Sequence, residues 1–200
     1  MNILNFDPKE VKGFSEVFKI QREIMVKFEP KLIDRIDSFD IDIYEDQMLL
    51  KDFLLSRLVE ELTEASVALG ADHEIHFKEE IIDAMNFLVE SYILYGWNEK
   101  KVKCDDFSSY MPPFNPSKTL IRQKIYDLIE QIGLTCNKLK IRPWRHSQYV
   151  VDLRVFEEEF LKIWEKFIDL CITSNISKKD LLNTWSQKMQ VNNFRLSTNY

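Results

Sequence analysis

The sequence predicts an all-α protein, folded as a helical bundle of about six helices. Two observations lead to this prediction: apolar residues recur every three or four positions in successive segments, and short turns separate most of these segments. Only four glycines occur in 200 residues. These glycines are too far apart to form a phosphate-cradling loop or a dinucleotide-binding fingerprint. We expect residues 1–200 to form a single domain, with a loop and helical insertion at about 101–176.

The first predicted helix runs from Val11 to Phe28 and is ended by Pro30. Gln21 falls within its apolar stripe, where another apolar residue is expected. Because a buried amide needs hydrogen-bond partners, Gln21 is either a polar side chain at the edge of the core or a functional group. Residues 29–46 are acidic and irregular, and their pattern leaves a short strand and a loop both open.

Two further helices are predicted at 47–69 and 77–95, followed by Gly70 and Gly96 as plausible C-caps. Charged residues and prolines then mark 100–118 as an extended connection.

The remaining helices are predicted at 119–140, at 153–173 and from Ser177 to about Phe194. Ser177 and Asp180 have the spacing of a capping box, which favours a helix start at this point.

The composition excludes several classes of protein. Acidic residues outnumber basic ones by 33 to 27, so the basic footprint of a general nucleic-acid binder is missing. Three widely separated cysteines fit a reducing cytosol better than a disulfide framework or a zinc site. With no export signal and no apolar stretch long enough to span a bilayer, we expect a cytoplasmic protein that does not bind membranes.

Four carboxylates stand out on the second and third predicted helices. A step of three residues keeps Glu61 with Glu64, and Glu80 with Asp83, on one helical face. Such pairs should arise by chance about five times in so acidic a sequence, so a solvated charged face is the first alternative. The carboxylates border apolar stripes, however, which favours a shared, partly buried site.

Carboxylates that converge in such a site repel one another unless cations neutralise them. Mg²⁺ is the expected cation, because it prefers oxygen ligands and bridges to substrate phosphates. A water held there and deprotonated with the help of a carboxylate would be the nucleophile. A di-iron site is not expected, because no histidine has a glutamate three residues before it, and the spacing of His73 and His76 is not that of a zinc protease.

A row of polar side chains follows the buried face of the last predicted helix. Leu181, Trp185, Lys188, Asn192 and Arg195 are separated by steps of four, three, four and three residues. The three polar members could clamp a phosphate chain, with lysine as a point charge, arginine as a bidentate donor and asparagine as an orienting amide. A contact with a partner protein is the alternative.

In these motifs the sequence resembles the dimeric dUTPases and phage dCTP/dUTP pyrophosphatases, within the all-α nucleoside triphosphate pyrophosphatases. The motifs are, in order, Glu61-x-x-Glu64, then Glu80-x-x-Asp83 followed by Ala84-Met85-Asn86-Phe87, then Lys188-x-x-x-Asn192-x-x-Arg195 with Tyr200 five residues on. Gln21 looks like the glutamine of the family's first motif.

The resemblance implies a dimeric dUTPase-like fold and a Mg²⁺-dependent hydrolysis that yields a nucleoside monophosphate and pyrophosphate. The four carboxylates would hold Mg²⁺, and Glu61 or Glu64 would activate the water. The implied substrate-binding residues are Gln21, Asn86, Phe87, Lys188, Asn192, Arg195 and Tyr200. The resemblance also implies a homodimer.

The base is less defined, because Asn86 stands where the family usually has histidine. We expect dUTP first, with dCTP or a modified pyrimidine triphosphate as the alternative. An alternative of another class is a catalytically silent helical dimer that binds a nucleotide or a protein through the same surfaces. Arg142 to Arg145 and Glu157 to Glu159 resemble a related phage pattern, but Lys162 occupies the place of an aspartate, so we interpret that stretch as structural or dimer-forming.

Overall fold

Helices make up most of the chain in the computed structural model, which describes residues 11–104, 115–139 and 151–198, with side chains as far as residue 195. No strand occurs within these ranges, which agrees with the all-α prediction. In chain order the elements are α1 (Phe14–Phe28), α2 (Leu32–Ser38), α3 (Tyr44–Lys51), the π-helical segment η2 (Asp52–Leu58), α4 (Val59–Gly70), α5 (Glu74–Leu94), α6 (Glu99–Val102), α7 (Lys118–Lys138), α8 (Leu153–Thr173) and α9 (Lys178–Thr198).

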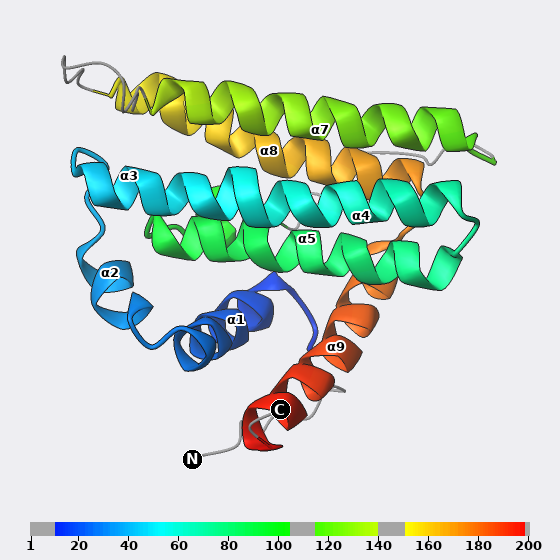
Figure 1. Cartoon of the computed structure of the whole chain (residues 1–200), viewed down its shortest axis with the longest axis horizontal. Helices are drawn as coiled ribbons and strands as arrows, with labels where there is room; N and C mark the ends of the chain where they lie inside the picture. Colours follow the sequence, from blue (N-terminus) through cyan, green and yellow to red (C-terminus); the bar gives the residue numbers. More distant parts are fainter. Residues whose placement is uncertain (1–10, 105–114, 140–150, 199–200) are drawn as a thin grey trace.

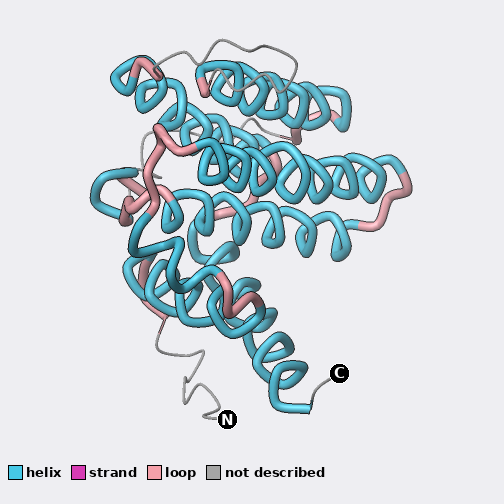
Figure 2. The backbone as a smooth tube through the Cα atoms, turned by 60° about the vertical axis from the view of Figure 1, so that its left-hand side comes forward, coloured by secondary structure: helices cyan, strands magenta, loops and turns pink. Residues whose placement is uncertain are grey.

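The long helices lie in three layers (Figure 1). Helices α7 and α8 pair in the first layer, and the continuous rod of α3, η2 and α4 lies beside α5 in the second. Helices α1 and α9 pack on the other side of α5, and the turned view in Figure 2 shows the same order. Helix α5 therefore lies at the centre of the bundle, where it contacts α1, η2, α4, α8 and α9.

The core continues from α5 into α8 through aromatic side chains. Tyr92 and Phe160 are fully buried, and their ring centroids lie 4.6 Å apart. The Tyr92 hydroxyl also donates a hydrogen bond of 3.0 Å to the backbone carbonyl of Phe160, so that this buried polar group is satisfied. Burial raises the pKa of the Tyr92 hydroxyl, which therefore acts only as a neutral donor.

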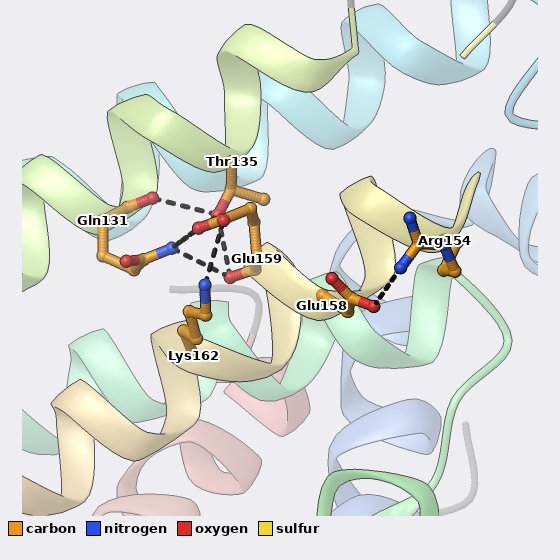
Figure 3. Close-up of polar contacts among 6 residues, drawn as sticks. All are labelled: Gln131, Thr135, Arg154, Glu158, Glu159 and Lys162. Carbon is orange, nitrogen blue, oxygen red and sulfur yellow. Dashed lines mark hydrogen bonds and ion pairs between the residues drawn. The ribbon is translucent and has the colours of Figure 1, made fainter. Parts of the chain in front are cut away.

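A polar network fixes α7 against α8 (Figure 3). Gln131 Nε2 donates to the Glu159 carboxylate at 2.7 Å and to the Glu159 carbonyl at 3.1 Å, and Thr135 Oγ1 donates to the same carbonyl at 3.0 Å. The hydrogen bond from Gln131, together with one from Lys162, lowers the pKa of Glu159. Lys162, which replaces the aspartate of the phage pattern, therefore has a structural partner, while Arg142 to Arg145 lie outside the described residues.

The six predicted helices are all present, and two short helices are additional. Residues 32–38, which the sequence left open between a strand and a loop, form α2 with Leu32 and Ile36 buried one turn apart. The start of the predicted extended connection is α6, whose N-terminus is capped by the Asn98 side chain. Phe28 is half exposed, although its spacing placed it on the buried stripe of the first helix.

The helix ends follow local chemistry. Gly96 has a φ of 81° directly after α5, as expected for a C-cap glycine. Gly70 is instead the last residue of α4, and Asp72 two residues later takes the left-handed conformation with a φ of 63°. Ser177 and Asp180 form the predicted capping box, with both reciprocal hydrogen bonds at 3.1 Å. None of the described helices is long and apolar enough to cross a membrane.

Candidate functional site

The hairpin of α4 and α5 brings four carboxylates together. Only Ala71, Asp72 and His73 separate the two helices, so α5 returns antiparallel along α4. One carboxylate oxygen from each of Glu61, Glu64 and Glu80 lies within 4.8 Å of the other two. The sequence predicted that these three side chains converge with Asp83, and the structure brings the three together.

The raised pKa of Glu61 reflects how close the carboxylates lie to one another. The pKa of Glu61 is raised from 4.5 to about 8, first by burial, then by a hydrogen bond shared with Glu80, and then by the charges of Asp83, Glu80 and Glu64. Asp83 therefore belongs to the same electrostatic cluster, although its oxygens lie outside the group of three. Such a cluster favours either a proton or a cation between its members.

The set of donors fits a hard divalent cation. Carboxylate oxygens from two facing helices are the ligands that Mg²⁺ prefers, and the spacing of at most 4.8 Å lets one ion contact three of them. His76 lies at the edge of this cluster, where its Nδ1 is 2.9 Å from Glu80 Oε1. The sequence did not connect His76 with the site, although its position four residues before Glu80 puts both on one helical face.

Helix α9 brings a cation to the acidic cluster. Lys188 Nζ forms an ion pair with Asp83 and donates a second hydrogen bond, of 3.4 Å, to the Glu79 carbonyl. Burial raises the pKa of Asp83, whereas Lys188 and a hydrogen bond of 3.4 Å from Asn86 Nδ2 oppose that rise. The sequence placed Lys188 across a bound substrate from the carboxylates, but in this structure the two groups are in direct contact.

The buried stripe of α9 sets this position. Leu181 and Trp185 are fully buried, and Trp185 Nε1 donates a hydrogen bond of 2.8 Å to Asn86 Oδ1 on α5. Both ends of the Asn86 amide are therefore held by protein groups. Farther along the same face Asn192 is half-buried and Arg195 is exposed, while Tyr200 lies outside the described residues.

A second polar group lies between α1 and α5. The Gln21 side chain is only 3% exposed, and its Nε2 donates a hydrogen bond of 2.8 Å to Glu90 Oε1. Gln21 Oε1 is buried and has no hydrogen-bond partner among the described residues. Burial raises the pKa of Glu90 from 4.5 to about 7, against the opposing effects of Gln21 and the Arg57 charge. We call Gln21 and Glu90 the amide–carboxylate pair.

Arg57 of η2 acts on this pair only through its charge. Arg57 pairs with Glu29 and, at 3.0 Å, with Asp52, and its guanidinium lies 4.1 Å from the Phe53 ring centroid and 6.0 Å from that of Phe87. An Asp52–Arg57 contact needs the wider π-helical turn, because residues five apart in an α-helix point about 140° away from each other.

Sequence reasoning missed Glu90 and Arg57. The signal for Glu90 was present, because it continues the face of Asp83 and Asn86 at steps of three and four residues. The neighbourhood of Arg57 depends on the π-helical turn, which no local pattern indicated.

A family model described as dUTPase matches residues 69–200. This span includes Glu80, Asp83, Asn86 and Lys188, whereas Glu61 precedes it. No curated protein and no solved structure matches the chain.

Proposed function

The chain belongs to the dUTPase family and is an enzyme of the dUTP diphosphatase type, and on this premise we propose that it hydrolyses dUTP to dUMP and pyrophosphate with Mg²⁺. One observation carries the proposal. Three carboxylates lie within 4.8 Å of one another, and Lys188 is paired with the fourth, Asp83. This arrangement supplies both the ligands for a cation and a counter-charge for a triphosphate.

In the proposed mechanism Glu61, Glu64, Glu80 and Asp83 would hold the cation, which would supply charge neutralisation at the phosphates and help to activate the attacking water. Glu61 or Glu64 accepts the proton of the attacking water. The raised pKa of Glu61 shows that its surroundings favour the protonated carboxyl in the absence of a cation. The bond that breaks joins the α-phosphate to the β-phosphate, and pyrophosphate leaves.

The C-terminal helix would bind the phosphates. Lys188 would leave Asp83 for the triphosphate once a cation occupies the carboxylates, because Asp83 cannot serve both as a metal ligand and as the close partner of an ammonium group. Asn192 and Arg195 follow on the same face of α9 and would bind farther along the phosphate chain. We also assign Tyr200 to substrate binding, on the family resemblance alone.

We place the base near Gln21, Asn86 and Phe87. Because Asn86 is held by Trp185 and lies against Asp83, its proposed role is to fix this wall of the pocket. The partly buried Phe87 offers an aromatic face beside it. dUTP is the proposed substrate, and dCTP or a modified pyrimidine triphosphate is the alternative.

A homodimer is part of the proposal. Tyr44, Met48 and Leu55 are exposed apolar residues on the α3 and η2 rod, and we propose this surface for the contact between two copies. Sedimentation velocity of wild type and of Leu55→Glu tests the assignment: we expect a dimer for the first and a shift toward monomer for the second. A wild-type monomer at all concentrations would contradict it.

The remaining proposals concern context. The three cysteines are buried free thiols, which supports a cytoplasmic location. Residues 101–176 contain α7 and α8, and we propose that this insertion buttresses the catalytic hairpin, because α7 packs against α4. The net charge of −6 agrees with a nucleotide rather than a nucleic acid as the ligand.

The test is a panel of the common ribonucleoside and deoxynucleoside triphosphates with Mg²⁺ and with EDTA, with pyrophosphate release as the readout. We expect dUTP to give the highest kcat/KM and EDTA to abolish release. Absence of pyrophosphate from every triphosphate, together with nucleotide binding that Glu80→Gln leaves intact, would instead indicate the catalytically silent dimer.

A further inference from the structure

We propose that Glu90 is a positioning residue for base recognition: it orients the Gln21 side-chain amide so that its carbonyl oxygen is presented to an N–H group of the base. This inference rests on the proposed function, because it requires a nucleotide to bind along α5. It adds a residue that none of the sequence motifs contains, and it predicts which edge of the base the protein contacts.

The orientation of the amide follows from the chemistry of its partner. Above its pKa of about 7, Glu90 is ionised and can only accept hydrogen bonds, so at pH 8 it selects the NH₂ end of Gln21, which donates to it at 2.8 Å. The carbonyl end must then point elsewhere. That oxygen is buried and receives no hydrogen bond from the described residues. A buried acceptor of this kind indicates an N–H donor that arrives with a ligand.

Packing alone does not explain the amide–carboxylate pair. Its neighbours along the two helices are the buried apolar residues Ile24, Met25, Val89 and Ile93. Two more apolar side chains would join α1 to α5 without the desolvation of a carboxylate. The charged groups that act on Glu90 are Arg57 of η2 and Glu29 after α1. Arg57 is bound to Glu29 and Asp52, so its compensation of Glu90 is indirect.

The position of the pair along α5 fits a nucleotide. Asp83, Phe87 and Glu90 follow one another at steps of four and three residues on one face of the helix. Seven residues of α-helix separate Asp83 from Glu90 by about 10 Å. A ligand whose phosphates bind through a cation to the carboxylates, and whose flat ring lies two turns away, would place the ring beside Phe87. The hydrogen-bonding edge of the ring would then lie at Gln21.

The free groups of the oriented amide match uracil. Gln21 retains its carbonyl oxygen and one further N–H, and these form an adjacent acceptor and donor. Uracil carries an N–H at position 3 with a carbonyl on either side, so it can pair with both groups whichever carbonyl faces the amide. Cytosine presents its acceptor and donor at N3 and the exocyclic amine, which requires the ring to shift in the pocket.

The first experiment compares steady-state kinetics of wild type, Glu90→Gln and the control Ser91→Ala with dUTP and dCTP. A glutamine at position 90 can donate as well as accept, so the Gln21 amide loses its fixed direction. We expect KM for dUTP to rise about tenfold in Glu90→Gln with kcat within about twofold of wild type. The dUTP preference over dCTP should fall by a similar factor, and the melting temperature should not fall. The neighbouring Ser91→Ala should leave both constants unchanged.

The second experiment does not depend on turnover. The ¹H–¹⁵N resonance of the Gln21 side-chain amide, assigned with Gln21→Leu, is followed as dUMP is added in EDTA. We expect a saturable shift in wild type that is lost or reduced about tenfold in apparent affinity in Glu90→Gln.

The two experiments separate the failure of this inference from that of the proposed function. If wild type hydrolyses dUTP but Glu90→Gln has unchanged KM and base preference, Glu90 is not a positioning residue and the proposed function stands. If wild type hydrolyses no triphosphate, the amide resonance decides: a dUMP-dependent shift that Glu90→Gln weakens supports the inference, and no shift overturns it.

Discussion

Lys188 of α9 forms an ion pair with Asp83 of α5, although 105 positions separate the two residues in the sequence. Trp185 lies one turn earlier on α9 and donates to Asn86, which lies one turn after Asp83 on α5. These two contacts attach the C-terminal helix to the carboxylate cluster at the point where the phosphates of the proposed substrate would lie.

The first prediction concerns the carboxylates of α5. Glu80→Gln should lower kcat at least about a hundredfold, because it removes one of the charges that hold the cation. The matched control is Glu79→Gln, since Glu79 is the adjacent residue but its side chain is half exposed. Pyrophosphate release by both variants and by wild type checks the prediction. Equal losses in the two variants would contradict the assigned role of Glu80.

The ion pair with Asp83 predicts opposite effects of one substitution. Lys188→Met should raise KM for dUTP roughly tenfold, because a phosphate contact is lost. The same variant should bind Mg²⁺ more tightly without nucleotide, because Asp83 no longer has a competing cation. Isothermal titration with Mg²⁺ measures the second effect, with the exposed Lys179→Met as the control. Weaker Mg²⁺ binding by Lys188→Met would show that the lysine supports the metal site instead.

Repulsion within the cluster predicts that a variant with fewer carboxylates is more stable without Mg²⁺ and is stabilised less by Mg²⁺. Glu61→Gln should raise the melting temperature at pH 7 in EDTA, because folding of wild type must either protonate Glu61 or hold its charge beside the other carboxylates, and glutamine avoids both costs. Wild type should gain about 2.7 kcal/mol when Mg²⁺ is present at a hundred times its Kd, and Glu61→Gln should gain less. Thermal unfolding with and without Mg²⁺ measures both effects. The exposed Glu60→Gln should behave as wild type, and a Glu61→Gln variant that melts lower in EDTA would refute the repulsion.

Glu90 predicts how stability depends on pH. Its pKa is about 7 in the folded protein and near 4.5 when unfolded, so between these values the folded state binds more protons. The free energy of unfolding should therefore fall as pH rises from about 4.5 to 7, by at most about 3 kcal/mol. Glu90→Gln should remove this component. Urea denaturation should therefore show that the free energy of unfolding of the variant, relative to that of wild type, is higher at pH 8 than at pH 5. A constant difference between the two proteins would contradict the assignment.

The Trp185–Asn86 hydrogen bond predicts a cost in stability. Trp185→Phe should lower the free energy of unfolding by about 2 kcal/mol, because it leaves a buried acceptor unsatisfied and a small void. Urea denaturation of wild type, Trp185→Phe and the double variant Trp185→Phe/Asn86→Leu measures this. The double variant should regain part of the loss, since the orphaned amide is removed. If the two variants unfold at the same urea concentration, the unsatisfied Asn86 acceptor does not account for the loss of stability.

The sequence predicted the elements with a sustained helical period. It missed α2 and α6, since a helix of one or two turns buries at most two apolar residues in these cases, too few to define a period. The carboxylate cluster was predictable because Glu61, Glu64, Glu80 and Asp83 lie on one hairpin, where spacing along each helix nearly determines proximity. The Gln21–Glu90 contact joins residues 69 positions apart, and only the packing of α1 on α5 determines it.

The π-helical segment η2 ends at Leu58, three residues before Glu61 in the same rod. Each residue of an α-helix advances the chain by about 100° around its axis. The wider turns of η2 advance the chain by less than this per residue, so η2 sets the rotational position of Glu61 and Glu64 on α4 relative to α3. A one-residue insertion or deletion in η2 would therefore turn the carboxylates of α4 away from those of α5 without altering any of them.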